Sequence, residues 1–151
     1  MRKLSALALG GALTLCITMS VVTPVLAQQS PAPVRLDPDK IAGLGLTAIP
    51  PDAYQEILVG GELNMRVATL FEGKELRVSI FESTPAKTDH RTRATDVDEF
   101  VYVLSGKLIL TEPSGKRHEY VPGDSLVLPV GYTGTWEMQG NYRELVVLAQ
   151  K

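Results

Sequence analysis

From residue 55 onward the sequence is a series of short apolar or alternating segments divided by turn residues. The segments are rich in β-branched and aromatic side chains and lie at 57–59, 66–71, 76–81, 99–104, 107–111, 118–121, 125–128, 135–138 and 143–148. Between them stand Gly60-Gly61, Ser105-Gly106, Pro122-Gly123-Asp124 and Gly140-Asn141. Short strands at near-regular spacing predict an all-β sandwich or barrel. No helical stretch after Pro51 is long enough to connect parallel strands, so we expect antiparallel sheets, which a jelly-roll barrel would close.

The first 27 residues have the pattern of a secretory signal peptide. Arg2 and Lys3 precede an uncharged apolar run, and small residues stand before a cleavage site after Ala27. The alternative is an uncleaved membrane anchor, because the uncharged stretch is long enough to span about 30 Å of hydrocarbon. Pro24, a helix breaker just before the site, favours cleavage. We therefore expect a protein of the periplasm or a secreted protein, which contacts the membrane only through the signal peptide before cleavage.

The remaining chain divides into a linker with a short helix at 28–54 and one domain at 55–151. Asp37-Pro38 predicts the start of the short helix, as an N-cap followed by proline. The only cysteine, Cys16, lies in the signal segment, so the mature chain has no disulfide and no thiol nucleophile. Removing Arg2 and Lys3 changes the formal charge from −2 to −4. With this charge and no basic stripe, we expect no nucleic-acid partner.

Two spacings of glycine, glutamate and proline narrow the choice of fold. Glu99 and Gly106 have six residues between them, and Gly123 is followed by five residues and then Pro129-x-Gly131. We expect Gly106 to form a tight turn between two strands, and Pro129-x-Gly131 to bend the chain at the rim of a barrel. In this order, with a hairpin over 107–121 between them, the two spacings resemble the two motifs of the cupin superfamily.

The closer resemblance is to small single-domain cupins grouped with the cupin domain of (S)-ureidoglycine aminohydrolase. It extends from Phe81 to about Leu148, and its motifs are Asp98-Glu99-Phe100, Tyr102-Val103-Leu104-x-Gly106, Pro122-Gly123-Asp124, Pro129-x-Gly131 and Gly134-Thr135-Trp136-Glu137. This resemblance implies a jelly-roll-type antiparallel β-barrel that holds a metal ion.

Three of the four metal ligands that the resemblance implies are absent from this sequence. Glu99 is present, but Gly134 stands at the position of the last histidine, and the paired histidines before the glutamate are replaced by Thr92 and Ala94, or by Arg93 and Thr95. One carboxylate cannot hold a transition metal tightly, because imidazoles supply most of the affinity at such sites. We therefore expect no tightly bound metal cofactor, and the manganese-dependent aminohydrolase activity does not carry over. A divalent metal would need a substitute ligand, for which His90 is the candidate.

Glu99 and Trp136 are the first candidates for ligand binding. The resemblance points Glu99 into the barrel, where its carboxylate would be a metal ligand, a general base with a raised pKa or an acceptor for an amine; the alternative is a structural ion pair. Trp136, the only tryptophan, shares a strand face with Met138 and is either a stacking wall or a core residue. Tyr132, just after the predicted rim bend, completes this group.

The polar segment 86–97 contributes His90 and Arg93, and we expect it to be a loop. If this loop folds over the barrel mouth, His90 approaches Glu99 as a second metal ligand; otherwise His90 is solvated. Arg93 would form part of a cationic rim that admits an anionic ligand, or would be compensated by the aspartates of the same segment.

Three functions remain open, and whether the protein is an enzyme is undecided. The first is binding of a small polar or anionic metabolite in the barrel without a tightly bound metal. The second is a metal-assisted enzyme that acts on a small molecule with Glu99 and a loop histidine. The third is a structural or accessory dimerisation module. Phe100, Tyr102 and Leu104 form an outward apolar stripe opposite Glu99, which predicts a homodimer.

Overall fold

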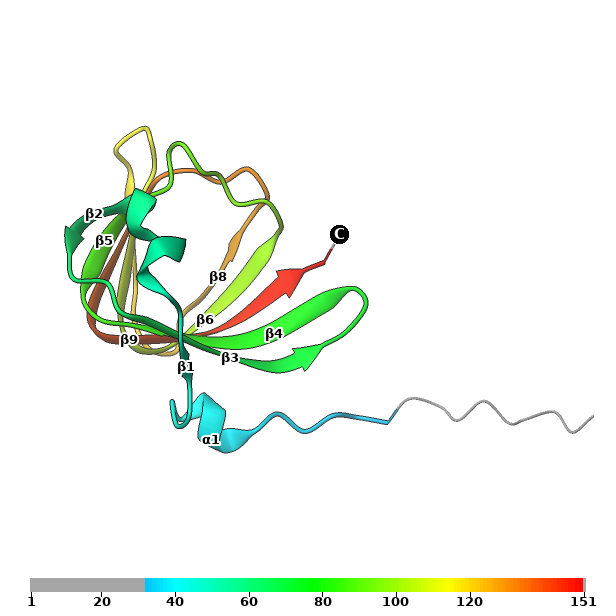
Figure 1. Ribbon diagram of the computed structural model, residues 1–151. Coiled ribbons are helices and arrows are strands. Elements are labelled where there is room, and N and C mark those ends of the chain that lie inside the picture. Colours follow the sequence, from blue (N-terminus) through cyan, green and yellow to red (C-terminus); the bar gives the residue numbers. More distant parts are fainter. Residues whose placement is uncertain (1–31, 151) are drawn as a thin grey trace, which may run out of the picture. The chain divides into compact units, whose positions relative to one another are not determined.

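The structure, a computed structural model, describes residues 32–150 (Figure 1). The predicted signal peptide, its cleavage site after Ala27 and the start of the linker lie outside the described residues. The described elements are the helix α1 (Pro38–Ile41), the 3-10 turns η1 (Pro51–Ala53) and η2 (Gln55–Ile57), and the strands β1 (Thr47–Ala48), β2 (Leu58–Gly61), β3 (Met65–Glu72), β4 (Leu76–Ser83), β5 (Ala86–Asp89), β6 (Glu99–Thr111), β7 (Arg117–Tyr120), β8 (Ser125–Leu128) and β9 (Thr135–Ala149).

The predicted short helix is confirmed as α1, which has a single turn. Asp37 caps its N-terminus, because its Oδ1 accepts a hydrogen bond of 2.9 Å from the backbone N–H of Asp39. Pro38 occupies the first helical position, where its missing N–H leaves no intrahelical bond unmade. Between residues 32 and 150, no helix has the length and apolar character needed to cross a membrane.

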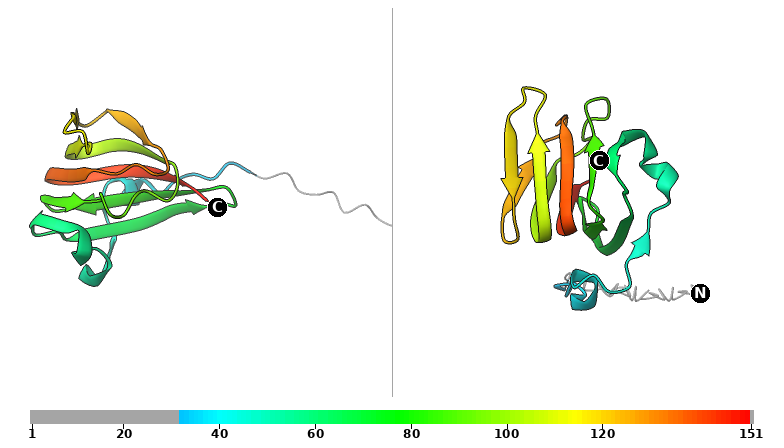
Figure 2. Two further views of the ribbon diagram at one scale, coloured as in Figure 1. Left: turned by 90° about the horizontal axis from the view of Figure 1, so that it is seen from above. Right: turned by 90° about the vertical axis from the view of Figure 1, so that its left-hand side faces the viewer.

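Two long strands, β6 and β9, pair with each other and belong to both halves of the barrel. The C-terminal part of β9 lies between β4 and the first residues of β6, and the sheet continues through β3 to β1 on one side and to β8 on the other. The N-terminal part of β9 lies between β5 and the last residues of β6, with β2 and β7 at the edges. All these pairs are antiparallel, and the strands curve around a common interior (Figures 1 and 2). The predicted all-β antiparallel barrel is therefore confirmed.

Gly106 and Gly140 do not form turns, which corrects the sequence-based prediction. Each lies inside a continuous strand, β6 and β9 respectively, where the pairing register shifts. Both have positive φ angles, 73° and 68°, and a Cβ on Gly106 would lie 2.7 Å from the carbonyl oxygen of Gln139. Glycine is required at Gly106 because a close backbone approach and a left-handed φ coincide there. The irregularity lets both strands serve both halves of the barrel.

The segment 86–97 is not entirely a loop, because Ala86–Asp89 forms strand β5. Its residues Ala-Lys-Thr-Asp have little strand propensity, and pairing with β9 on one side and β2 on the other supplies the stabilisation instead. The strand ends where the backbone N–H of His90 donates a 2.7 Å hydrogen bond to the carbonyl of Gly134. This bond fixes the position of His90 at the wall of the barrel.

The alternation expected along β6 is present. Val101 and Val103 are fully buried, whereas Phe100 and Tyr102 are 40% and 39% exposed on the opposite face. The inward valines belong to one apolar cluster with residues of β8 and β9. The outward apolar stripe therefore exists, and the homodimer that it suggested stays a prediction.

Candidate functional site

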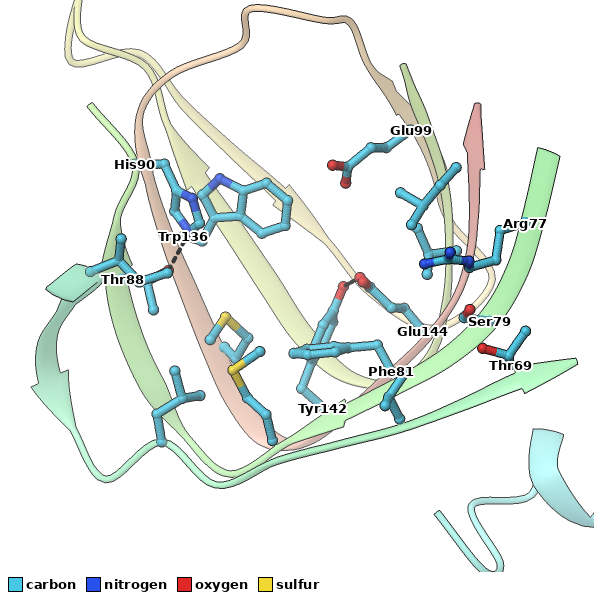
Figure 3. A pocket seen from close by; sticks show the side chains of 17 residues that line it. Thr69, Arg77, Ser79, Phe81, Thr88, His90, Glu99, Trp136, Tyr142 and Glu144 are labelled. Atoms are coloured by element: carbon cyan, nitrogen blue, oxygen red, sulfur yellow. Dashed lines mark hydrogen bonds between the residues drawn. The ribbon is translucent and has the colours of Figure 1, made fainter. Parts of the chain in front are cut away.

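A cavity of about 390 Å³ lies inside the barrel. Side chains of β3, β4, β5, β6 and β9 line it, together with Ile57, Leu63 and His90 (Figure 3). Most of the lining is apolar and includes Met65, Val67, Phe81, Trp136, Met138 and Val146. Polar groups are few: the lining has two carboxyl groups, one imidazole, three small hydroxyl groups, one phenol and one guanidinium. An apolar cavity with a few polar groups is the usual form of a small-molecule site.

An aromatic wall on one side of the cavity consists of Trp136 and His90. Their ring centroids are 5.0 Å apart, with the planes inclined by 35°. His90 Nε2 is 3.0 Å from the hydroxyl oxygen of Thr88, and Thr88 is paired with Trp136 across β5 and β9. The indole N–H of Trp136 is buried and has no hydrogen-bond partner among the described residues. The wall is therefore held by β5 and β9 and keeps one unused donor.

His90 is partly buried in this wall, not solvated. Burial lowers the pKa of its imidazole, and the positive charge of Arg93 lowers it further. Because the pKa of His90 lies below the ordinary value of 6.5, its imidazole is mostly neutral at pH 7. His90 lies across the cavity from Glu99 in Figure 3, so the two residues line the same cavity from different sides.

Glu99, the first residue of β6, points its carboxyl group into the cavity as expected (Figure 3). Its strand neighbours are the apolar residues Leu128 and Leu148, which help to shield it from water. No ion pair or side-chain hydrogen bond joins Glu99 to another residue in the described range 32–150. Burial raises the pKa of Glu99 to about 7, and the nearby charge of Asp96 adds to the effect. The alternative of a structural ion pair is therefore not what the structure has.

A second carboxyl group, which the sequence analysis missed, belongs to Glu144 on β9. Glu144 is 5% exposed, and its Oε2 accepts a hydrogen bond from the hydroxyl of Tyr142, which is 1% exposed. Burial raises the pKa of Glu144 to about 7; the Tyr142 hydrogen bond lowers it and the charge of Glu99 raises it. The influence of Glu99 on this pKa places the two carboxyl groups within electrostatic reach of each other.

A sequence signal for Glu144 exists. In a continuous strand, Trp136, Met138, Tyr142 and Glu144 all have the same parity, and all four line the cavity. Because Gly140-Asn141 was interpreted as a turn, the two parts of β9 were treated as separate strands, and the shared face of Trp136 and Glu144 could not be predicted.

Of the other predicted site residues, Met138 lies inside the cavity, whereas Arg93 and Tyr132 do not line it. Arg93 is exposed and lines a neighbouring hollow of about 250 Å³ together with Asp96, Glu99, His90 and Trp136. Met138 lines the main cavity, as expected from its place beside Trp136. Tyr132 is partly buried against the core but does not line either hollow, and its hydroxyl has no partner in the part of the chain that the structure describes.

The residues at the expected metal positions do not fit a metal ion. At Gly134, where the resemblance implies a histidine, a Cβ would lie 2.5 Å from the carbonyl oxygen of Thr111. At the upstream positions, Thr95 uses its hydroxyl to bond the Pro129 carbonyl at 2.8 Å, and Arg93 is exposed. Within residues 32–150, no three His, Cys, Asp or Glu side chains are grouped as metal ligands would be. Glu99 and His90 alone would be a weak pair of metal ligands.

The barrel with its interior cavity defines this protein as one with a cupin fold. Residues 71–144 match the family model described as the EutQ-like cupin domain. The predicted cupin fold is therefore confirmed, whereas the finer resemblance to the (S)-ureidoglycine aminohydrolase group stays a prediction. No curated protein sequence matches the chain.

Three solved structures align with more than half of this chain. The EutQ protein of Clostridium difficile aligns with a TM-score of 0.52 at 19% identity, over 58% of this chain and 69% of that one. A protein of unknown function from Pseudomonas syringae aligns with a TM-score of 0.60 at 24% identity, over 68% of this chain but only 43% of its own length. The polyketide cyclase RemF of Streptomyces resistomycificus aligns with a TM-score of 0.51 at 21% identity, over 71% of this chain and 75% of that one. At these identities the likeness is one of fold.

Proposed function

We propose that this protein binds a small, largely apolar molecule inside its barrel. The observation that carries the proposal is the cavity of about 390 Å³, which has an apolar lining and an aromatic wall. Small-molecule sites in proteins have volumes of roughly 300–1,000 Å³. The carboxyl group of Glu99, which lines the cavity and has no side-chain partner among residues 32–150, is a polar group that a ligand would satisfy.

The lining disfavours an anion, which narrows the expectation of a polar or anionic metabolite. Glu99 and Glu144 both line the cavity, and a bound anion would oppose their ionisation. The guanidinium of Arg77 also lines it, but this group bonds Glu72 at 2.8 Å and belongs to an exposed residue. The proposal is therefore a neutral or positively charged ligand.

The test uses Trp136, the only tryptophan, as a fluorescent reporter inside the cavity. Candidate molecules are screened for a change in tryptophan emission together with a rise in melting temperature. Ser79 is 4% exposed and lines the cavity, so Ser79→Leu fills the space and abolishes both signals, whereas the matched variant Ser79→Ala retains them. Ligands that bind Ser79→Leu as tightly as the parent protein would place binding outside the barrel and contradict the proposal.

General acid–base catalysis is a second candidate function, favoured by one observation. Glu99 has a pKa of about 7, so both its acidic and its basic forms are populated at neutral pH. An enzyme of this kind would exchange protons of a bound ligand with solvent. Deuterium uptake from D2O into a ligand found by the screen, lost in Glu99→Gln, would support catalysis; equal uptake in the variant would exclude this role for Glu99.

Export remains part of the proposal and rests on the first 27 residues. Expression of the full chain in a bacterium, followed by osmotic shock and mass measurement, tests it. A product in the periplasmic fraction that begins at Gln28 supports export. Intact protein that begins at Met1 and stays with the membrane supports the anchor instead.

A further inference from the structure

The cavity wall carries acidic groups that no cation of the protein neutralises within the described range. Glu99 and Glu144 line the cavity, and Asp96 lines the neighbouring hollow together with Glu99. The nearby cations do not pair with these carboxyl groups, because Arg77 bonds Glu72 and Arg93 is exposed. The interior therefore has a negative electrostatic potential whenever either glutamate is ionised.

The two glutamates differ in what they can offer a ligand. Glu144 already accepts a hydrogen bond from Tyr142, which fixes its position. Glu99 is half-buried and has no side-chain partner in the described chain. A partly desolvated carboxylate without a partner is costly, so a cation that enters the cavity gains more from Glu99 than from Glu144.

The rest of the lining suits an organic cation better than a metal ion. Trp136 and Tyr142 present aromatic rings to the cavity, and such rings attract ammonium groups and also pack against hydrocarbon. Metal ions instead need several oxygen or nitrogen ligands in one place, and no such group of three exists between residues 32 and 150.

Building on the proposed function, we infer that the ligand is a small organic ammonium ion, with Glu99 as its counter-ion and Trp136 against its apolar body. Glu99 and Trp136 lie on opposite sides of the cavity in Figure 3. The ligand therefore has its charge at one end and its apolar or aromatic part at the other, and Glu144 with Tyr142 lies beside the path between them.

Three probes of one shape test the inference on the full-length, folded protein: 2-phenylethylammonium, 2-phenylethanol and phenylacetate. Their affinities are measured through Trp136 emission, excited where the phenyl ring does not absorb. A charged hydrogen bond in a shielded site makes the ammonium ion bind roughly tenfold to hundredfold more tightly than the alcohol. Phenylacetate binds more weakly than either.

Glu99→Gln removes the counter-ion and brings the ammonium ion to the affinity of the alcohol. Glu119→Gln makes the same change of charge on the exposed face of β7, where Glu119 bonds Lys107, and leaves the preference unchanged. If Glu99→Gln does not fold, as judged by circular dichroism, the relative affinities of the three probes for the parent protein still test the inference. Equal binding of ammonium ion and alcohol overturns the inference and leaves the proposed function intact. The proposed function fails separately, if Ser79→Leu does not block binding.

Discussion

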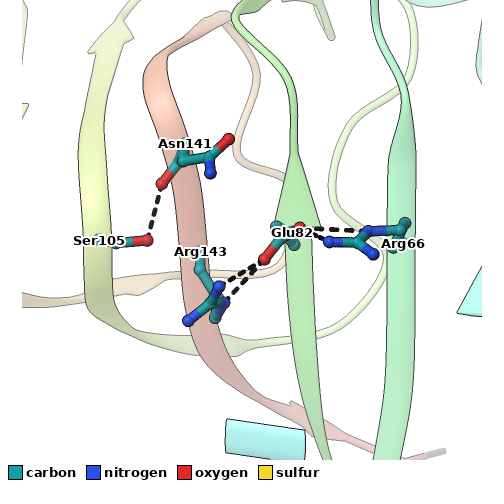
Figure 4. Close-up of polar contacts among 5 residues, drawn as sticks. All are labelled: Arg66, Glu82, Ser105, Asn141 and Arg143. Atoms are coloured by element: carbon teal, nitrogen blue, oxygen red, sulfur yellow. Dashed lines mark hydrogen bonds and ion pairs between the residues drawn. The ribbon is translucent and has the colours of Figure 1, made fainter. Parts of the chain in front are cut away.

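Glu82 and Glu144 are buried to a similar degree on opposite faces of one sheet, but their hydrogen-bond partners differ in charge. Glu82 on β4 is 7% exposed and Glu144 on β9 is 5% exposed. On the outer face, Glu82 accepts hydrogen bonds from Arg66 on β3 and, at 2.9 and 2.7 Å, from Arg143 on β9 (Figure 4). Inside the barrel, the described partner of Glu144 is an uncharged hydroxyl, that of Tyr142.

The two pKa values move in opposite directions for this reason. Burial raises the pKa of Glu82, but the hydrogen bonds and charges of Arg66 and Arg143 outweigh it, so the pKa is lowered overall. Burial raises the pKa of Glu144 to about 7, and the Tyr142 hydrogen bond only reduces the shift. Burial therefore does not decide the charge of a carboxyl group here; the charge of its partner does. On the outer face, Glu82 with Arg66 and Arg143 joins the strands β3, β4 and β9. Inside the barrel, the hydrogen bond between Tyr142 and Glu144 keeps two polar groups within an apolar cavity.

Removing Glu82 is expected to have the largest effect on stability. Glu82→Ala leaves two arginines side by side on adjacent strands and costs roughly 3 kcal/mol of unfolding free energy, in the range for breaking a buried ion pair. Urea unfolding at pH 7 measures it. The control is Glu119→Ala, whose exposed ion pairs with Lys107 and Arg117 are screened by solvent and contribute little to stability. Equal losses in the two variants would show that the cluster of Glu82, Arg66 and Arg143 does not stabilise the sheet.

The pH dependence of stability is expected to reveal the charge of Glu144. Its pKa is raised from 4.5 to about 7, so the folded state binds the proton more tightly than the unfolded state. Stability is therefore lost as pH rises through this window, by about 2 kcal/mol between pH 5 and 8 for this one group. The lowered pKa of His90 acts in the opposite direction, so the measured quantity is the difference between the parent and Glu144→Gln. A difference that does not change with pH would mean that Glu144 has an ordinary pKa.

A smaller change is expected from removing the hydroxyl of Tyr142. Tyr142→Phe takes away the hydrogen bond that lowers the pKa of Glu144, so that pKa rises further. The midpoint of the pH-dependent loss of stability moves to higher pH, and stability at pH 8 falls by about 1 kcal/mol, since a buried acceptor loses its donor. Thermal unfolding from pH 5 to pH 9 follows both effects. A midpoint that moves to lower pH would contradict the described hydrogen bond.

The smallest effect on stability is expected at the outward apolar stripe. Tyr102→Lys replaces a 39% exposed side chain and changes the unfolding free energy of the monomer by less than about 0.5 kcal/mol. If the predicted homodimer forms through this stripe, the same change converts it to a monomer in light scattering. A parent protein that is monomeric at high concentration would remove the dimer prediction.

Sequence patterns predicted the fold well wherever local signals coincide with the barrel. The alternation of Glu99, Val101 and Val103 predicted which face of β6 is buried, and Ser125–Leu128 was predicted with its correct bounds. Strand β5 could not be predicted, because its polar residues are held in a strand by β2 and β9, which are distant in sequence. Gly106 and Gly140 were wrongly predicted as turn residues, because the sequence alone does not distinguish a glycine in a turn from a glycine with positive φ at an irregularity within a strand.

These failures account for what was missed in the site. Without β5, His90 could be placed only in a loop, whereas its backbone bond to Gly134 fixes it in the wall. Without a continuous β9, Glu144 could not be related to Trp136. Glu99 and Met138 both line the cavity. The family resemblance pointed Glu99 inward, and Met138 was placed on the face of Trp136 by the alternation of a single strand.

The place of β9 in the sheet has a consequence for how the chain reaches its native state. This strand, residues 135–149, follows every other described strand in the sequence, yet β4, β5 and β6 all pair with it. Leu76, for example, finds its partner in Ala149. Until β9 is available for pairing, β4, β5 and β6 each have an unpaired edge and one side of the cavity is open. Closure of the barrel is therefore expected to wait for β9, at the slow rate typical of proteins dominated by contacts between distant residues.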